Sequence, residues 1–321
     1  MIDANLEEAT ASAPATVSNV AVGFDILGFS LSGIGDRVTV RRRDKPGVEI
    51  TQITGRWQVP DQPEHNSATA GLVQLVEDRQ LEFGLAVKIE KGVPVSSGLG
   101  GSASSAVAGV VAASAVLDQP LSLPERFHYA LLGEYEACGK RRGDNIAPAL
   151  LGGLVLIRSM DPLDTMRIPV PHDMGVVVVY PHLTLEVREA RRLLDESVNM
   201  EDFVAQSANL AGFIGGCFRD DRAMISRSLK DLIIEPQRSH LIPGFDEVKE
   251  AARQAGALNC SISGAGPAVF ALHDLHTDAE ALCEAMTTAF EDAGVDDVTG
   301  LVSPLNGLGA YVVQRGETDG N

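Results

Sequence analysis

The amino-acid sequence predicts an α+β protein built from two domains, on the basis of three observations. A chain of 321 residues with 45% hydrophobic composition can bury a large core and fits two domains better than one. Runs with strand-like alternation and runs with helical spacing follow one another along the chain. Asp, Pro and Met dominate residues 159–173, so we place the boundary there and assign residues 1–165 and 166–321 to the two domains.

The first half combines strand patterns with two helices. Leu85, Val87 and Ile89 fall on one face of a strand, as in a half-buried sheet. The strands expected in this half cover residues 38–42, 48–53, 85–90 and 152–158. Small residues from 103 to 117 predict a buried helix after a glycine-rich loop, and residues 124–138 predict a second helix.

The second half begins with residues 175–180, which are apolar on both faces and indicate a fully buried strand. The elements expected after it are helices at 186–197, 201–218, 222–232 and 245–255, strands at 259–262 and 268–272, a helix at 278–293 and a strand at 310–314. With the extra helices set aside, this order is the split βαβ pattern of a ferredoxin-like domain. That fold does not by itself define a function.

The composition excludes several classes of partner. Forty-four acidic residues against 26 basic ones give a net charge of −18, which repels nucleic acid and anionic membranes. The first residues lack the pattern of a secretory signal, and the apolar run at 103–117 is too short to span a membrane, so we expect a cytoplasmic protein. The four cysteines form no CxxC pair, which argues against a disulfide framework or a zinc site.

The strongest local signal is the glycine-rich segment Pro94-Val-Ser-Ser-Gly-Leu-Gly-Gly-Ser-Ala-Ser-Ser105. Its glycines allow tight turns and close approach to a ligand, and the following helix directs free N–H groups into the loop. This arrangement favours an anion, and hydroxyl groups such as that of Ser102 suit phosphate oxygens or Mg²⁺. The loop lacks the GxxxxGK[ST] pattern of a Walker loop, and glycine-rich loops before helices are also common without a ligand.

Two further constellations place polar residues where a ligand could need them. Asn19 and Asp25 lie in a small, apolar stretch, where they either bind a ligand or cap turns. Glu134 or Glu136 precedes the segment Arg142-Gly-Asp-Asn-Ile-Ala-Pro148 and could supply a carboxylate for Mg²⁺, the alternative being a solvated helix face. The Glu235–Arg238 tract and the Gly264-Ala-Gly266 turn add weaker signals.

Together these motifs resemble the GHMP superfamily of small-molecule kinases. The resemblance rests on PxxxGLGxS at the loop, a PAT…N…GFD…LG segment near the N-terminus and SGAGP near residue 265. Within that superfamily, PATxxNxxxGFDxLG, DNxAP, ExxR…LIPGF and SGAGPAVFAL are similar to the homoserine kinase family. The match covers nearly the whole chain and implies an N-terminal α/β domain with a left-handed βαβ unit and a ferredoxin-like C-terminal domain.

The resemblance also implies a role for individual residues. Ser102 and Glu134 would hold Mg²⁺, and Asn66 would lie near the adenine of ATP. The loop residues implied to bind ATP are Pro94, Ser96, Ser97, Gly98, Leu99, Gly100, Gly101, Ser102, Ala103 and Ser104. The residues implied to bind L-homoserine are Asn19 and Asp25 toward its amino group, Arg191 and Arg238 toward its carboxylate, Asn145 near its hydroxyl, and Gly264 in the neighbouring turn.

The sequence departs from the family pattern at several positions. Gly101 replaces the first serine of GLGSSAA, and hydroxyl groups stand instead at Ser104 and Ser105. Arg142 replaces the histidine of HxDN, and Val187 stands where a threonine is expected near the substrate. The Val187 departure keeps open a sibling kinase that acts on another hydroxy-amino acid such as threonine.

The resemblance implies direct in-line phosphoryl transfer, in which positioning and charge neutralisation supply most of the catalysis. Asp144 could take the hydroxyl proton or orient its neighbours, and Lys88 or Arg142 could offset the γ-phosphate charge. A metabolite-binding protein without turnover is the alternative from another class, against which the retained Ser102 and Glu134 argue. The family also implies a homodimer.

Overall fold

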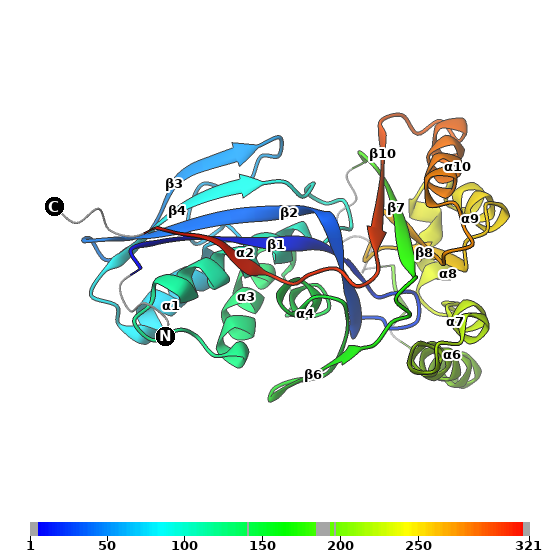
Figure 1. Cartoon of the computed structure of the whole chain (residues 1–321), viewed down its shortest axis with the longest axis horizontal. Coiled ribbons are helices and arrows are strands. Elements are labelled where there is room, and N and C mark those ends of the chain that lie inside the picture. Colours follow the sequence, from blue (N-terminus) through cyan, green and yellow to red (C-terminus); the bar gives the residue numbers. More distant parts are fainter. Residues whose placement is uncertain (1–5, 140, 184–192, 196, 317–321) are drawn as a thin grey trace.

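The computed structural model describes residues 6–139, 141–183, 193–195 and 197–316. Within these ranges the chain forms two β-sheets, each covered by helices (Figure 1). The first sheet and its helices fill one end of the elongated molecule, and the second sheet and its helices fill the other (Figure 1). The predicted α+β class is therefore confirmed.

The described part of the first sheet has seven strands. They are β1 (Glu8–Ser18), β2 (Leu27–Arg43), β3 (Gly47–Gly55), β4 (Gly84–Lys91), β5 (Leu154–Met160), β6 (Leu163–Ile168) and β11 (Tyr311–Gly316). The order is β11-β1-β2-β4-β3, and β5 also pairs with β2 and continues into β6. β3 and β4 run parallel, and α1 (Ala70–Arg79) connects them as a βαβ unit.

Helices of the first half cover one face of this sheet, as Figure 1 shows. They are α1, α2 (Gly101–Val116), α3 (Leu123–Cys138) and α4 (Ile146–Leu151). α2 consists almost entirely of Gly, Ala, Ser and Val, which lets it pack closely on all sides, and most of its residues are buried. α3 begins at a capping box between Ser122 and Glu125. This packing fixes the start of α2 beneath the centre of the sheet.

The second sheet has the strand order β10-β7-β9-β8 within the described residues. Its strands are β7 (Gly175–Pro181), β8 (Asn259–Ile262), β9 (Val269–His273) and β10 (Val298–Pro304). In chain order this arrangement is 4-1-3-2 and antiparallel, the pattern of a ferredoxin-like sheet. The predicted split βαβ pattern is therefore confirmed.

The helices described in the second half lie on both faces of this sheet. They are α6 (Met200–Arg219), α7 (Arg222–Ser228), α8 (Glu235–Arg238), the 3₁₀ helix η1 (Ser239–Leu241), α9 (Phe245–Gln254) and α10 (Ala279–Asp292). On one face of β7, Val177 and Val179 pack into a core with α9 and α10. On the other face, Val176 and Val178 join a core that includes Phe213 of α6 and residues of β1 and β2. The second core therefore ties the two sheets together, which explains why β7 is apolar on both faces.

Several predicted elements need correction. The strand expected at 310–314 forms, but as β11 it pairs with β1 in the first sheet. The fourth strand of the second sheet is instead β10, which the sequence patterns missed. The boundary drawn at residue 165 falls inside β6, a strand of the first sheet. The helix expected over 222–232 ends at Ser228, and most of the one expected over 186–197 lies outside the described residues.

Candidate active site

A cavity of about 480 Å³ lies where the two halves of the chain meet. The glycine-rich loop and the start of α2 line it from the first half, and the turn at Gly264 and Ala265 lines it from the second. Backbone hydrogen bonds join these walls, because Gly264 N donates to Ser18 O and Ala268 N donates to Ser97 O. The cavity is therefore built across the junction of the two sheets.

The glycine-rich loop has the backbone geometry that its sequence predicts. Gly98 has φ +84° and Gly100 has φ +63°, in the left-handed region that favours glycine. A Cβ at Gly98 would lie 2.6 Å from the carbonyl oxygen of Ser263, and one at Gly100 would meet the side chains of Thr16 and Asn145. The 16-residue helix α2 begins directly after Gly100, so its free N–H groups face the loop. These features suit the loop to the binding of an anion.

A buried ion pair supports the loop from beneath. Lys91 Nζ lies 2.6 Å from Asp36 Oδ2 and also donates to the carbonyl oxygen of Gly101 at 3.0 Å. Asp36 further accepts hydrogen bonds from the Ser105 hydroxyl and from the backbone N–H groups of Gly92 and Val93. Burial lowers the pKa of Lys91, and the carboxylates of Asp36 and Glu134 oppose that effect. The pair thus fixes the first turn of α2 and puts a positive charge at the cavity wall.

The unusual serines of the loop belong to this support. The Ser104 hydroxyl donates to the carbonyl of Ala13 and accepts from the backbone N–H of Asp36, so it does not line the cavity. A Cβ at Gly101 would lie 3.1 Å from Lys91 Nζ, which leaves little room for the serine typical of the family. Loss of the serine at 101 and gain of hydroxyl groups at Ser104 and Ser105 are therefore parts of one arrangement around Asp36.

Two buried carboxyl groups lie in the same cavity. Burial raises the pKa of Glu134 to about 7, although a hydrogen bond from Ser102 opposes the shift. Burial and the nearby Asp25 raise the pKa of Asp144 to about 6, opposed by Arg142 and a hydrogen bond from Ser18. Oε2 of Glu134 is buried and has no hydrogen-bond partner among the described residues. A cation bound at Ser102 and Glu134 would satisfy that oxygen, so these residues fit Mg²⁺.

A strained turn contributes Ser18 and Asn19 to another wall of the cavity. Asn19, Val20, Ala21 and Asp25 all have positive φ although none is glycine. The Asn19 side chain holds this turn, because its Nδ2 donates to Gly264 O at 2.8 Å and its Oδ1 accepts from Asp25 N at 3.0 Å. Such conformations cost of order 1–3 kcal/mol each and persist where the surrounding structure enforces them, often at ligand sites.

Two arginines approach this wall. Arg142 lies 3.5 Å from the carboxylate of Asp25. Arg238 is 2% exposed, lies over the ring of Phe24 and donates to Gly264 O at 3.5 Å. The neighbouring Glu235 pairs with Lys249 and accepts a hydrogen bond from Ser261. A buried guanidinium at a cavity wall is suited to a carboxylate ligand.

The structure brings most of the predicted site residues together. Those that line the cavity are Asn19, Ser96, Ser97, Gly98, Gly100, Gly101, Ser102, Glu134, Asp144, Asn145, Arg238 and Gly264. Leu99 and Ala103 are buried in the hydrophobic cores and Pro94 contributes its carbonyl to the Ser97 hydroxyl, so these three do not line it. Asn66 does not line it either, because its side chain bonds Pro60 O and Ala68 N. Arg191 and Val187 lie outside the described residues.

The sequence interpretation missed Lys91 and offered Lys88 in its place. Lys88 is exposed on β4 and does not line the cavity, whereas Lys91 does. The alternation that puts Leu85, Val87 and Ile89 on the buried face also puts residue 91 there, so the signal was present in the sequence. The rim residues Gln58, Val59, Pro60 and His65 come from the loop after β3 and had no recognisable motif.

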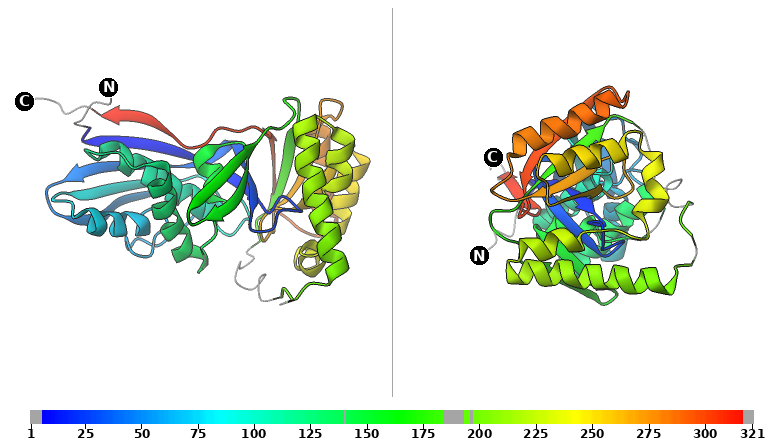
Figure 2. Two further views of the ribbon diagram at one scale, coloured as in Figure 1. Left: turned by 90° about the horizontal axis from the view of Figure 1, so that it is seen from below. Right: turned by 90° about the vertical axis from the view of Figure 1, so that its right-hand side faces the viewer.

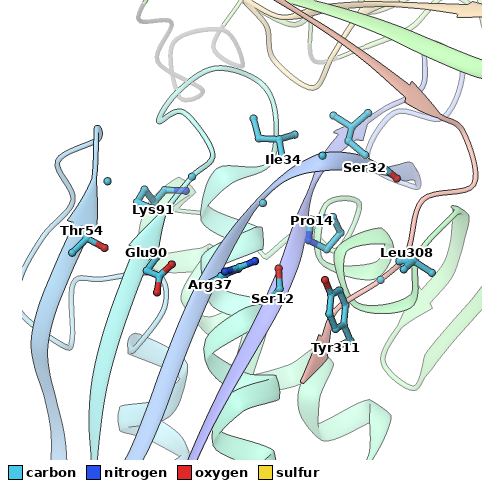
Figure 3. A pocket seen from close by; sticks show the side chains of 16 residues that line it. Ser12, Pro14, Ser32, Ile34, Arg37, Thr54, Glu90, Lys91, Leu308 and Tyr311 are labelled. Carbon is cyan, nitrogen blue, oxygen red and sulfur yellow. The ribbon is translucent and has the colours of Figure 1, made fainter. Parts of the chain in front are cut away.

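A second cavity, of about 620 Å³, lies on the face of the first sheet opposite its helices (Figure 3). Arg37 and Glu90 extend over this face from neighbouring strands, and the hydroxyl of Tyr311 approaches from β11 (Figure 3). Most of its polar side chains are exposed, in contrast to the buried groups of the first cavity. The buried titratable groups therefore single out the first cavity as the candidate active site.

Comparison with known proteins identifies the family. The model of the GHMP kinases N terminal domain matches residues 67–153, and that of the GHMP kinases C terminal matches residues 213–292. A crystal structure of homoserine kinase from Cytophaga hutchinsonii superposes with a TM-score of 0.91 at 40% identity, covering 96% of this chain and 98% of that one. Lactococcus lactis galactokinase complexed with galactose has a TM-score of 0.70 at 16% identity, covers 95% of each chain and shows the fold alone.

Two sheets that meet at a glycine-loop cavity are the architecture of a GHMP kinase, and the chain belongs to that family of enzymes. A homoserine kinase of Xylella fastidiosa (strain M12) is 47% identical over 307 residues, which cover 95% of this chain and 94% of the relative. One from Chlorobaculum tepidum is 39% identical over 321 residues, covering 96% and 99%. Within the GHMP kinases, the chain therefore belongs to the homoserine kinase family.

Proposed function

We propose that the enzyme transfers the γ-phosphoryl group of ATP to the side-chain hydroxyl of L-homoserine, yielding O-phospho-L-homoserine for threonine biosynthesis. The observation that carries the proposal is one cavity lined by two chemically different groups, the glycine-rich loop and the buried guanidinium of Arg238. We call the lining around the loop the nucleotide end and the lining around Arg238 the substrate end. Such a cavity suits a nucleotide facing a small substrate that bears a carboxylate.

At the nucleotide end, the loop N–H groups and Lys91 would bind the phosphates, while the rim from Gln58 to His65 lies where a base could sit. Ser102 and Glu134 would hold Mg²⁺, which neutralises phosphate charge when bound. Only the ionised carboxylate of Glu134 would bind the cation. Cation binding would therefore lower the pKa of Glu134 from its raised value. Asn66 would act on nucleotide binding indirectly, because its side chain holds the loop after β3 in which the rim residues lie.

At the substrate end, Arg238 lines the cavity and would bind the carboxylate of L-homoserine, and Arg191 would assist it as the family resemblance implies. Asp25 does not line the cavity but pairs with Arg142, which does, and from there it would attract the ammonium group. Asn145 would orient the hydroxyl, and its own side chain is held by a 2.7 Å hydrogen bond from Thr16. Asn19 and Gly264 would shape this wall through the hydrogen bond that joins them.

The phosphoryl group would pass directly from ATP to the hydroxyl of the substrate. The transition state of such a transfer is loose, so correct positioning of the reactants supplies most of the rate enhancement. Asp144 has a pKa of about 6, so it is largely ionised at neutral pH and can accept the hydroxyl proton or orient Asn145. Arg142 and Lys91 would offset the negative charge that gathers around the γ-phosphate.

A coupled ADP-release assay on homoserine, threonine, serine, mevalonate and galactose tests the proposal. We expect kcat/KM for homoserine to exceed that for every other alcohol by at least tenfold. A preference for threonine would assign the enzyme to a sibling activity. ADP release with none of the five would favour a metabolite-binding role and contradict the proposal.

The partners follow from the same proposal. ATP, Mg²⁺ and a small alcohol are the expected ligands, and the cytoplasm is the expected compartment. None of the helices in the described ranges is long and apolar enough to span a membrane. The homodimer implied by the family stays a prediction.

A further inference from the structure

The rim of the candidate active site is held on its two sides by different halves of the chain. The rim residues Gln58, Val59 and Pro60 line the cavity, but Gln58 and Pro60 are exposed, so packing in a core does not fix them. On one side, Asn66 Nδ2 donates to Pro60 O at 2.6 Å, a contact within the first half. On the other side stands Trp57, whose ring contacts the second half.

The ring of Trp57 stacks on the imidazole ring of His182. The two ring centroids lie 5.6 Å apart and the ring planes meet at 15°. Offset, nearly parallel rings are a favourable arrangement of two aromatic groups. Trp57 is half-buried, although its neighbours Arg56 and Gln58 are exposed. His182 directly follows β7 of the second sheet, and the two sheets lie end to end in the left-hand view of Figure 2, so the stacked rings bridge the two halves.

The second sheet holds the ring of His182 in place. Its Nε2 lies 3.0 Å from the hydroxyl oxygen of Thr299, within hydrogen-bond distance, and its centroid lies 5.3 Å from that of the Tyr180 ring. The backbone N–H of His182 donates to Asp297 O at 3.1 Å. Tyr180 and Thr299 are themselves partners in the pairing of β7 with β10. Trp57 therefore rests on a ring that two strands of the second sheet support.

We propose that Trp57 and His182 are positioning residues for the nucleotide, because their stacked rings fix the rim where the base of ATP would lie. The inference rests on the nucleotide end of the proposed function. Neither ring lines the cavity, so both act through the rim residues that follow Trp57. A rim that is fixed in advance need not be ordered when the nucleotide binds, whereas a loose rim would lose affinity to that ordering.

The effect should fall on one substrate only. The substrate end is formed around Arg238 and Gly264, and Arg238 donates to the carbonyl of Gly264 rather than to a rim residue. Loss of the stacked rings should therefore weaken nucleotide binding and leave homoserine binding nearly unchanged. If the rings only covered apolar surface, their loss would instead lower stability and leave both affinities as they are.

The decisive experiment measures binding of ADP and Mg²⁺ to the full-length protein by titration calorimetry, which needs no turnover. His182→Ala should raise Kd for ADP about threefold to tenfold, and KM for homoserine should stay within about twofold. His182→Phe keeps a ring that can stack on Trp57 and should restore Kd to within about twofold of the wild type. The matched control is His276→Ala, an exposed histidine outside the cavity, which should change neither constant.

Fluorescence shows whether the contact itself has been lost. Trp57 is the one tryptophan of the chain, so its emission reports on this position alone. The emission should move to longer wavelength in His182→Ala, because the ring becomes more exposed to water, and it should move less in His182→Phe. Circular dichroism should be the same for the wild type and both variants.

A double-mutant cycle tests whether the two rings act as one unit. Trp57→Ala should weaken ADP binding as much as His182→Ala does, and the double variant should be no weaker than either, because each substitution removes the same contact. An unchanged Kd for ADP in His182→Ala would overturn the proposal, and so would additive losses in the double variant or a loss that His182→Phe does not restore. Failure of the proposed function would look different, since the wild type would then bind ADP without phosphorylating homoserine.

Discussion

The two ends of the cavity are built in different ways. The proposed nucleotide end is made mostly of backbone from one continuous segment, residues 94–105, and its glycines set the geometry. The substrate end is made of residues that lie far apart in the sequence. Asn19, for example, bonds Gly264, which lies 245 positions later in the chain. Binding of a common cofactor can thus depend on a local motif, whereas choice of the second substrate depends on tertiary packing.

Lys91 supports the nucleotide end, and its loss should have the largest effect on stability. Lys91→Met would leave Asp36 charged and buried without its partner, which should lower the free energy of unfolding by about 3–5 kcal/mol. Urea denaturation followed by circular dichroism measures this change. Lys88→Met on the same strand is the matched control, and its exposed side chain should contribute less than about 0.5 kcal/mol. Equal effects of the two substitutions would show that the buried pair does not support the loop.

The raised pKa of Glu134 should make the metal-free protein less stable as pH rises. Because the folded-state pKa is about 7 and the ordinary value is 4.5, the folded protein binds more protons than the unfolded one between those values. The free energy of unfolding should therefore fall by about 3 kcal/mol from pH 4.5 to pH 7 on account of this group. Thermal denaturation across that range should show the decline.

Substitution of Glu134 separates this effect from the other titrations. Glu134→Gln should flatten the pH dependence, whereas Glu136→Gln at the cavity rim should leave it unchanged. If the Glu136 variant alone flattens the profile, the assignment of the buried carboxylate to residue 134 is wrong. Asp144, with its pKa of about 6, should account for much of the slope that remains in Glu134→Gln.

Ser102→Ala should affect catalysis at the nucleotide end without affecting binding at the substrate end. A contact to Mg²⁺ and the transferring phosphates tightens in the transition state, so kcat should fall about 100-fold while homoserine binding changes little. Ser104→Ala is the matched control, because the Ser104 hydroxyl is buried and bonds backbone groups of Ala13 and Asp36. That control should lower stability and leave kcat within about threefold. A larger fall in kcat for Ser104→Ala than for Ser102→Ala would reverse the two roles.

These contrasts also explain what the sequence could predict. The glycine loop was predictable because its conformation is local. All fourteen strands and helices expected outside residues 184–192 formed near their expected positions, although α7 is shorter than expected and β11 lies in an unexpected sheet. β1 was missed because Pro14 and its alanines give a weak strand pattern, and pairing with β2 overrides that preference. Asp36 was missed because nothing nearby in sequence shows that Lys91, 55 positions later, will neutralise it.

Arg238→Lys should give the smallest effect of the four and the sharpest test of the substrate end. Lysine keeps the charge but removes the planar fork that binds both oxygens of a carboxylate, so KM for homoserine should rise at least tenfold, about 1.4 kcal/mol. KM for ATP should move by less than about twofold, because in the proposed complex the glycine loop would bind the nucleotide without Arg238. Steady-state kinetics with each substrate varied in turn measures both constants.

The matched control for Arg238→Lys is Arg222→Lys, which alters an arginine paired with Asp173 and Asp220 outside the cavity. It should change neither KM, since partly exposed ion pairs contribute about 0 to 1 kcal/mol and act on stability alone. Glu235, three residues before Arg238, pairs with Lys249, and Arg238 bonds the carbonyl of Gly264. An unchanged homoserine KM in Arg238→Lys would therefore leave Arg238 as a group that holds the Gly264 turn, and recognition of the carboxylate would pass to other residues. A parallel rise in both KM values would instead mean that the turn couples the two ends, since Gly264 bonds Ser18 and the adjoining Ser263 bonds the carbonyl of Gly98 in the loop.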